Sequence, residues 1–134
     1  MNPSLNGSWY YRSFRHDPIV VDKGEVVGEP ELALPWSPRG ILLARTGADG
    51  TVSGTLTFAP GIALEVSGSV VPATDSSPAS LALTGKGLGS VNRIKGFFIP
   101  ESGHVVGTIL CAEHDLLRHP NGTVGPFVLM PIEP

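Results

Sequence analysis

Four residues with titratable side chains lie close together at Glu113-His114-Asp115 and His119. Histidine and carboxylate groups are the usual zinc ligands and the usual general acids and bases of enzymes. Their spacing differs from the His-Glu-x-x-His pattern, which places two ligands on one face of a helix. Because they lie where an apolar segment runs out into a loop, we interpret them as a solvated polar loop. We expect no metal site and no cofactor.

Three further patterns have the residue types of catalytic or phosphate-binding motifs. His16-Asp17 has the composition of an oriented general base, but adjacent residues of an extended chain point to opposite sides. Cys111 lies within the apolar segment 109–112, where a thiol behaves as a small, inert hydrophobe. No helix follows the glycines of residues 85–89, so they predict a hairpin turn rather than a phosphate loop. None of these patterns identifies a catalytic residue.

The chain around these residues is organised by the alternation of apolar and polar side chains. In residues 51–58, Val52 and Leu56 point to one side and the threonines to the other, which is the period of a half-buried strand. The turn at residues 47–50 contains Gly and Asp, which accept the positive φ of a tight hairpin. The expected strands cover residues 8–15, 41–45, 51–59, 62–71, 80–85, 91–99, 104–113 and 124–130.

These strands and their short turns, with no helical periodicity, predict an all-β fold. We expect one domain over residues 1–134, an eight-stranded antiparallel up-and-down β-barrel, with a sandwich as the alternative. Residues 16–39 form a long insertion with four prolines, in which residues 19–21 or 25–27 could add a short strand. We expect the insertion to fold over one mouth of the barrel with Trp36 as its anchor. The alternatives are a solvated loop or a strand packed on a neighbouring subunit.

The composition argues against several classes of function. Of the 134 residues, 41% are hydrophobic and 16% are charged, as in globular proteins. The net charge of −3 and the lack of a basic run argue against nucleic-acid binding. No apolar run reaches the length of a membrane span, and the single Cys111 excludes an intramolecular disulfide. The first residues lack the pattern of a signal peptide, so we expect a cytoplasmic protein, with a mature secreted form as the alternative.

Three motifs are similar, in the same order, to those of the avidin and streptavidin family. Residues 5–10, Leu-Asn-Gly-Ser-Trp-Tyr, are similar to the family's first strand. Residues 47–57 resemble the hairpin between its second and third strands. Residues 66–68 and 72–75 resemble its fourth strand and the loop that follows. The resemblance implies a barrel that holds one small molecule and packs into a homo-oligomer through its outer faces.

The resemblance does not extend to the residues that hold biotin in that family. The alignment places Tyr11 where the family has the Asn that binds the ureido oxygen. The polar Tyr, Ser and Asp contacts of the family fall at Leu56, Phe58 and Phe127, and two of its tryptophans fall at Ile94 and Leu110. Ser90 and Asn92 resemble the family's small polar contacts. Because each lost hydrogen bond costs about 1–3 kcal/mol, we expect no tight binding of biotin.

The sequence leaves three functions open, because a barrel of this size holds one small ligand or is filled by its own side chains. The first function is binding of a small, largely apolar ligand, with Tyr11, Ser13 and Arg15 as polar anchors near one end. The second is an enzyme of the isomerase or cyclase type, in which Tyr11, Arg15 or a histidine at the rim acts on an apolar substrate. The third is a filled barrel that acts through its surface or its oligomer.

Some strands are apolar on both faces, at residues 41–44, 109–112 and 127–130. A barrel strand whose outer side faces water should alternate between apolar and polar residues. Continuous apolar runs therefore leave an apolar patch on the outside, which monomers rarely tolerate. We expect a homo-dimer or a homo-tetramer.

Overall fold

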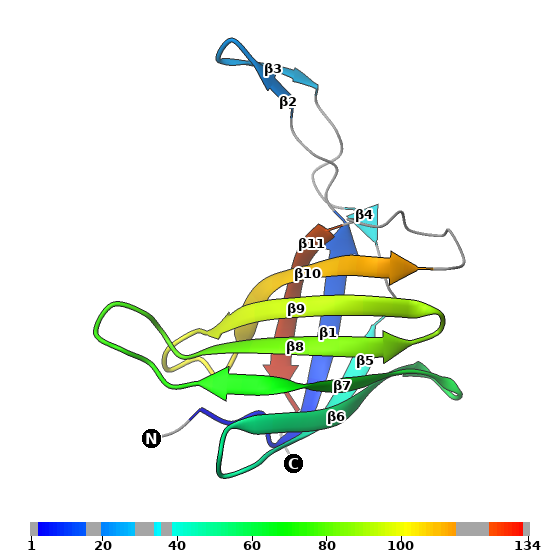
Figure 1. The fold of residues 1–134 in the computed structure, drawn as a ribbon, viewed down its shortest axis with the longest axis vertical. Helices are drawn as coiled ribbons and strands as arrows, with labels where there is room; N and C mark the ends of the chain where they lie inside the picture. Colours follow the sequence, from blue (N-terminus) through cyan, green and yellow to red (C-terminus); the bar gives the residue numbers. More distant parts are fainter. Residues whose placement is uncertain (1–2, 16–19, 29–33, 36–38, 115–123, 133–134) are drawn as a thin grey trace.

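Eight antiparallel strands form a closed barrel in which most strands pair with their neighbours in sequence (Figure 1). The computed structural model describes residues 3–15, 20–28, 34–35, 39–114 and 124–132. Its strands are β1 (Gly7–Arg15), β2 (Val20–Asp22), β3 (Glu25–Gly28), β4 (Leu34–Pro35), β5 (Gly40–Thr46), β6 (Thr51–Ala59), β7 (Ile62–Val71), β8 (Ser80–Gly87), β9 (Ser90–Phe98), β10 (Val105–His114) and β11 (Val124–Pro131). The barrel consists of β1 and β5 to β11, and the pairing of β1 with β11 closes it. The predicted up-and-down barrel is confirmed, and the sandwich alternative is wrong.

Within the insertion at residues 16–39, two short strands pair with each other. β2 and β3 are joined by Lys23 and Gly24, whose φ angles of 52° and 83° are those of a tight two-residue hairpin turn. The sequence suggested a short strand at residues 19–21 or at residues 25–27. The structure has a strand at each place, β2 and β3. The third short strand, β4, pairs with the end of β1. Trp36 lies outside the described residues, so the lid stays a prediction.

Alternation sends one set of side chains from every barrel strand into a single apolar core. The buried cluster contains Leu5, Trp9, Tyr11, Leu42, Ala44, Val52, Leu56, Leu64, Val66, Val70, Leu81, Leu83, Ile94, Val105, Ile109, Phe127 and Leu129. Across the described ranges, no helix has the length and apolar character needed to span a membrane.

Inward-facing glycines allow neighbouring strands to approach closely enough for a small barrel. A Cβ atom added to Gly54 would meet the carbonyl oxygen of Leu43 on the adjacent strand. Added to Gly68 or Gly107, it would likewise meet a backbone carbonyl oxygen of the next strand. Any larger residue would push the strands apart, so these positions let the sheet coil tightly.

The segment before β1 closes one end of the barrel, which we name the closed end. Leu5 is fully buried, and its carbonyl oxygen accepts a hydrogen bond of 2.8 Å from the indole N–H of Trp9. The N–H of Leu5 donates to Thr46 Oγ1 at 2.9 Å, and the N–H of Thr46 donates to Asn6 Oδ1 at 2.6 Å. Both ends of the described chain lie at this end of the barrel (Figure 1). The expected position of Trp9 near a closed end is thus confirmed.

Candidate functional site

The opposite end of the barrel differs from the closed end in its inward-facing residues. On six of the eight strands, the buried residue nearest this end is small or polar. These residues are Ser13, Gly40, Gly85, Asn92, Cys111 and Gly125, and we name them the polar end. The other two strands, β6 and β7, place Leu56 and Leu64 there, with the half-buried Phe58 beyond Leu56. One end of an otherwise apolar interior is therefore lined by short side chains and polar groups.

The buried polar groups are the informative part of this end, because buried apolar residues are what any barrel needs. Ser13 and Asn92 are 1% and 7% exposed. Asn92 Nδ2 donates to Ser90 Oγ at 3.1 Å, and the Ser90 hydroxyl donates to the carbonyl oxygen of Gly87 at 2.9 Å. These bonds hold the Asn92 amide in place among the inward-facing residues of the polar end.

Three aromatic rings pack together beside the polar end, and we name Tyr11, Phe58 and Phe127 the aromatic floor. Tyr11 stacks on Phe127 with 6.3 Å between the ring centroids and meets Phe58 edge-on at 6.1 Å. The void at the centre, lined by Tyr11, Phe127 and aliphatic side chains, measures about 10 Å³. That is about the space that one water molecule needs. The protein's own side chains therefore fill the centre, and a ligand at the polar end would rest on the aromatic floor.

Eight of the eleven residues predicted for a ligand site line the interior of the barrel. They are Tyr11, Ser13, Leu56, Phe58, Ser90, Asn92, Ile94 and Phe127. Leu110 does not line it: its side chain is on the outer face and 36% exposed, whereas Ile109 and Cys111 face inward. The alignment was one residue out of register in β10, and a slip of one residue reverses the face of a strand. The side chains of Arg15 and Trp36 are outside the described residues.

The titratable patterns of the sequence do not form a site in the described structure. His16-Asp17 and residues 115–119 lie outside the described residues. Among the side chains that the structure does describe, no group of three or more His, Cys, Asp or Glu could hold a metal ion. Cys111 is buried in the barrel at 1% exposure, as expected of a core thiol.

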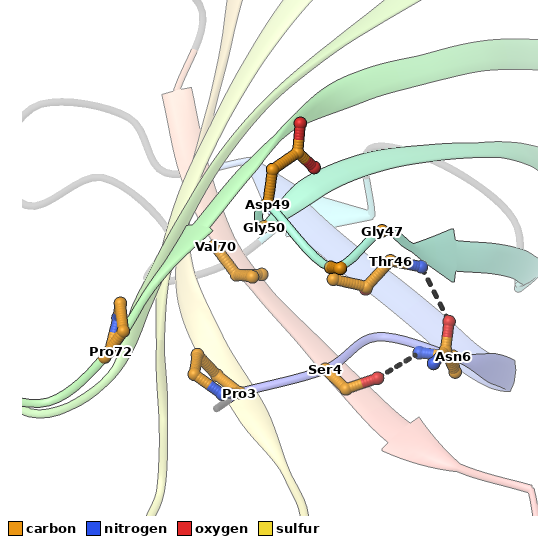
Figure 2. Close-up of a pocket in the computed structure, with 10 residues that line it drawn as sticks. Pro3, Ser4, Asn6, Thr46, Gly47, Asp49, Gly50, Val70 and Pro72 are labelled. Atoms are coloured by element: carbon orange, nitrogen blue, oxygen red, sulfur yellow. Dashed lines mark hydrogen bonds between the residues drawn. The ribbon is translucent and has the colours of Figure 1, made fainter. Parts of the chain in front are cut away.

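A second cavity lies at the closed end, between the segment before β1 and the turn from β5 to β6 (Figure 2). Its volume is about 340 Å³, which is within the range of small-molecule sites. It is lined by Pro3, Ser4, Asn6, Thr46, Gly47, Ala48, Asp49, Gly50, Val70 and Pro72. No sequence pattern predicts this cavity, because none of these residues has a type and spacing typical of ligand chemistry. The hydrogen bonds that join Leu5 and Asn6 to Thr46 bring the segments together.

The charged group of this cavity, Asp49, belongs to the turn rather than to a binding site. Its Oδ1 accepts a hydrogen bond of 3.0 Å from the Thr51 N–H. This bond, together with the Thr51 hydroxyl, lowers the pKa of Asp49 below its ordinary value of 3.8. In Figure 2 its carboxylate points away from Pro3 and Ser4 on the other wall. The carboxylate therefore fixes the hairpin and does not converge with a second polar group on a ligand position.

Comparison with known protein families, with curated proteins and with solved structures finds no match to this chain. The similarity to the avidin and streptavidin family therefore stays a prediction from its motifs.

Proposed function

We propose that the protein binds a small, largely apolar molecule at the polar end of its barrel. The observation that carries the proposal is the burial of small and polar residues on six strands directly beside the aromatic floor. A barrel that needed only stability would be filled there by large apolar side chains, as it is at the closed end by Trp9, Val52 and Leu129. An eight-stranded barrel can hold one small molecule, and we place that molecule at the mouth with the shorter side chains.

The proposed ligand has a flat apolar body and one hydrogen-bond donor. The aromatic floor offers ring faces and edges, against which a planar apolar group packs favourably. Asn92, whose side-chain nitrogen is held by Ser90, would accept the donor of the ligand with its Oδ1. Because the void beyond the floor is about 10 Å³, the ligand stays in the mouth and does not reach the centre.

An enzyme of the isomerase or cyclase type is not proposed, because no observation favours it. That alternative relied on Tyr11, Arg15 or a histidine at the rim. Of these, the structure describes the Tyr11 side chain at this end, and it packs between the rings of Phe58 and Phe127. Such a position suits the floor of a site better than a group that exchanges protons with solvent.

Indole is a suitable probe, because it is a flat apolar molecule with a single N–H donor, and N-methylindole is the matched probe without that donor. We expect calorimetry of the full chain to show about 2- to 13-fold tighter binding of indole than of N-methylindole, the worth of one hydrogen bond. The Asn92→Leu variant should bind both probes equally. Ser69→Ala, on the exposed outer wall of β7, serves as the control and should keep the preference.

The location of the probe is read from NMR shifts on adding indole. Shifts at the amides of Gly85, Ser90 and Asn92 support the proposal. Shifts confined to Ala48 and Gly50 would place the probe in the cavity of the closed end and contradict it. Equal binding of both probes by the unmodified protein would also contradict it.

A further inference from the structure

Large apolar side chains form a continuous band on the outside of the barrel, across β5, β1, β11, β10 and β9. The apolar band consists of Ile41, Leu43, Tyr10, Met130, Val128, Val106 and Phe97. The strand register makes it continuous: Ile41 and Met130 lie opposite Tyr10 on its two sides, and Val106 lies opposite Val128. Leu43 is 60% exposed, Phe97 50% and Tyr10 40%. The apolar runs of the sequence therefore place half of their side chains in contact with solvent.

The other side of the barrel has a different outer wall, formed by β6 and β7. Its outward residues are mostly polar: Thr51, Ser53, Thr55, Thr57, Glu65, Ser67 and Ser69, with Ala63 and Val71 near the two ends of β7. Hydroxyl groups and a charge make this wall suitable for contact with water, whereas the apolar band contains no charged residue. The contrast between the two walls indicates that the apolar band has a partner of its own.

We infer that the apolar band is the interface through which two copies of this chain pack face to face. In such a two-fold dimer the same surface is used by both copies, so the apolar surface of one copy is covered by that of the other. The hydroxyl wall of β6 and β7 could not serve as the complementary surface, because it would lose contact with water. Because the band is uncharged, two copies meet in it without repulsion between like charges.

The exposed area of the band matches what a dimer requires. With large side chains of about 200 Å² each, the exposed fractions of Leu43, Phe97, Tyr10, Met130 and Ile41 leave about 450 Å² of apolar surface. A standard interface covers about 800 Å² per partner and is about 56–65% apolar, which corresponds to about 450–520 Å². Tyr10 lies between Ile41 and Met130 near the middle of the band, where a tyrosine contributes most to association.

Arg12 lies next to the band on β1, opposite Val128, and places a charged group at its border. Its guanidinium carbon is 5.6 Å from the centroid of the Phe14 ring. Its Nε is buried and has no hydrogen-bond partner, which is costly for a charged group.

Sedimentation velocity of the full chain at micromolar to millimolar concentration tests the inference. We expect a species of about twice the 14.0 kDa chain mass. Tyr10→Lys and Leu43→Lys place an ammonium group in the middle and at the edge of the band, and should raise the dissociation constant at least about 100-fold. Ser67→Lys adds the same charge to the hydroxyl wall and should leave the dimer unchanged. All three positions are on the outer face, so we expect each variant to fold. Melting temperature and circular dichroism check that it does.

Three results would overturn the inference. The first is a monomer at every concentration, and the second is a dimer that Ser67→Lys weakens as much as Tyr10→Lys does. The third is binding of the monomer to phosphatidylcholine vesicles in a flotation assay, abolished by Tyr10→Lys, which would assign the band to a lipid surface.

Discussion

Two glycines on neighbouring strands are expected to respond to alanine in opposite directions, although both face the interior of the barrel. Gly85 on β8 and Gly96 on β9 are buried, and neither has a positive φ, so backbone conformation does not require glycine at either position. At Gly85 the nearest atom to an added Cβ is Leu64 Cδ1 at 3.5 Å, an ordinary van der Waals distance. At Gly96 the added Cβ would lie 2.8 Å from Phe127 Cζ and 2.8 Å from the carbonyl oxygen of Val106.

The magnitudes follow from these distances. Gly85→Ala restricts the unfolded chain, which stabilises by about 0.4–1 kcal/mol, and it buries a methyl group in existing space. Gly96→Ala forces Phe127 or β10 to move, and such overpacking costs about 1–3 kcal/mol. The two variants should therefore differ by about 1.4–4 kcal/mol in the free energy of unfolding.

Urea unfolding followed by far-ultraviolet circular dichroism measures this difference. We expect the midpoint to rise for Gly85→Ala and to fall for Gly96→Ala, with an unchanged m-value in both. In a thermal scan the separation should be on the order of 10 °C for a chain of this size. Because Gly85 belongs to the polar end, its alanine variant should also bind indole less tightly while being more stable. Destabilisation of the same size in both variants would refute the reasoning from Cβ distances.

The remaining predictions concern single groups. Trp9→Phe should destabilise the fold by about 1–3 kcal/mol in urea unfolding, because the buried carbonyl oxygen of Leu5 loses its donor; an unchanged midpoint would contradict the role of this bond. Asp49→Asn should remove part of the loss of stability in acid. The folded-state pKa of Asp49 lies below 3.8, so its contribution is present above that pH and is lost as pH falls through the folded value. Acid unfolding curves that coincide for the two proteins would exclude it. Biotin should bind no more tightly than micromolar in calorimetry, and nanomolar binding would show that the expected loss of polar contacts is wrong.

Local patterns were sufficient to predict the strands, because each one combines alternation with a turn. Val52 and Leu56 point inward as expected, and so do Trp9 and Tyr11. The choice between a barrel and a sandwich depended on the pairing of Trp9 with Pro131, a contact between distant parts of the chain that no local pattern specifies.

The site was predicted less completely, for reasons that are also physical. Alternation identifies which residues face inward, but it does not show how far the rings of Tyr11 and Phe127 extend across the barrel. The small void therefore became visible only when the packing was known. Leu110 was predicted to face inward because the alignment was shifted by one residue in β10. Such a shift moves a side chain to the other face of the strand. The cavity at the closed end depends on how the segment before β1 folds back to Thr46, which residue types alone do not indicate.

The pairing of β1 with β11 has a consequence for the order of the strands along the chain. The N–H of Ile132 donates to the carbonyl oxygen of Ser8 at 2.9 Å, so the two ends of the barrel sequence lie side by side. In a closed ring of strands each strand has the same two neighbours wherever the chain is cut. A circular permutant that joins these ends by a short linker and opens at the exposed turn Pro60-Gly61 should therefore reach the same barrel. Evolution or design could begin this chain at any exposed turn without changing a single strand pairing.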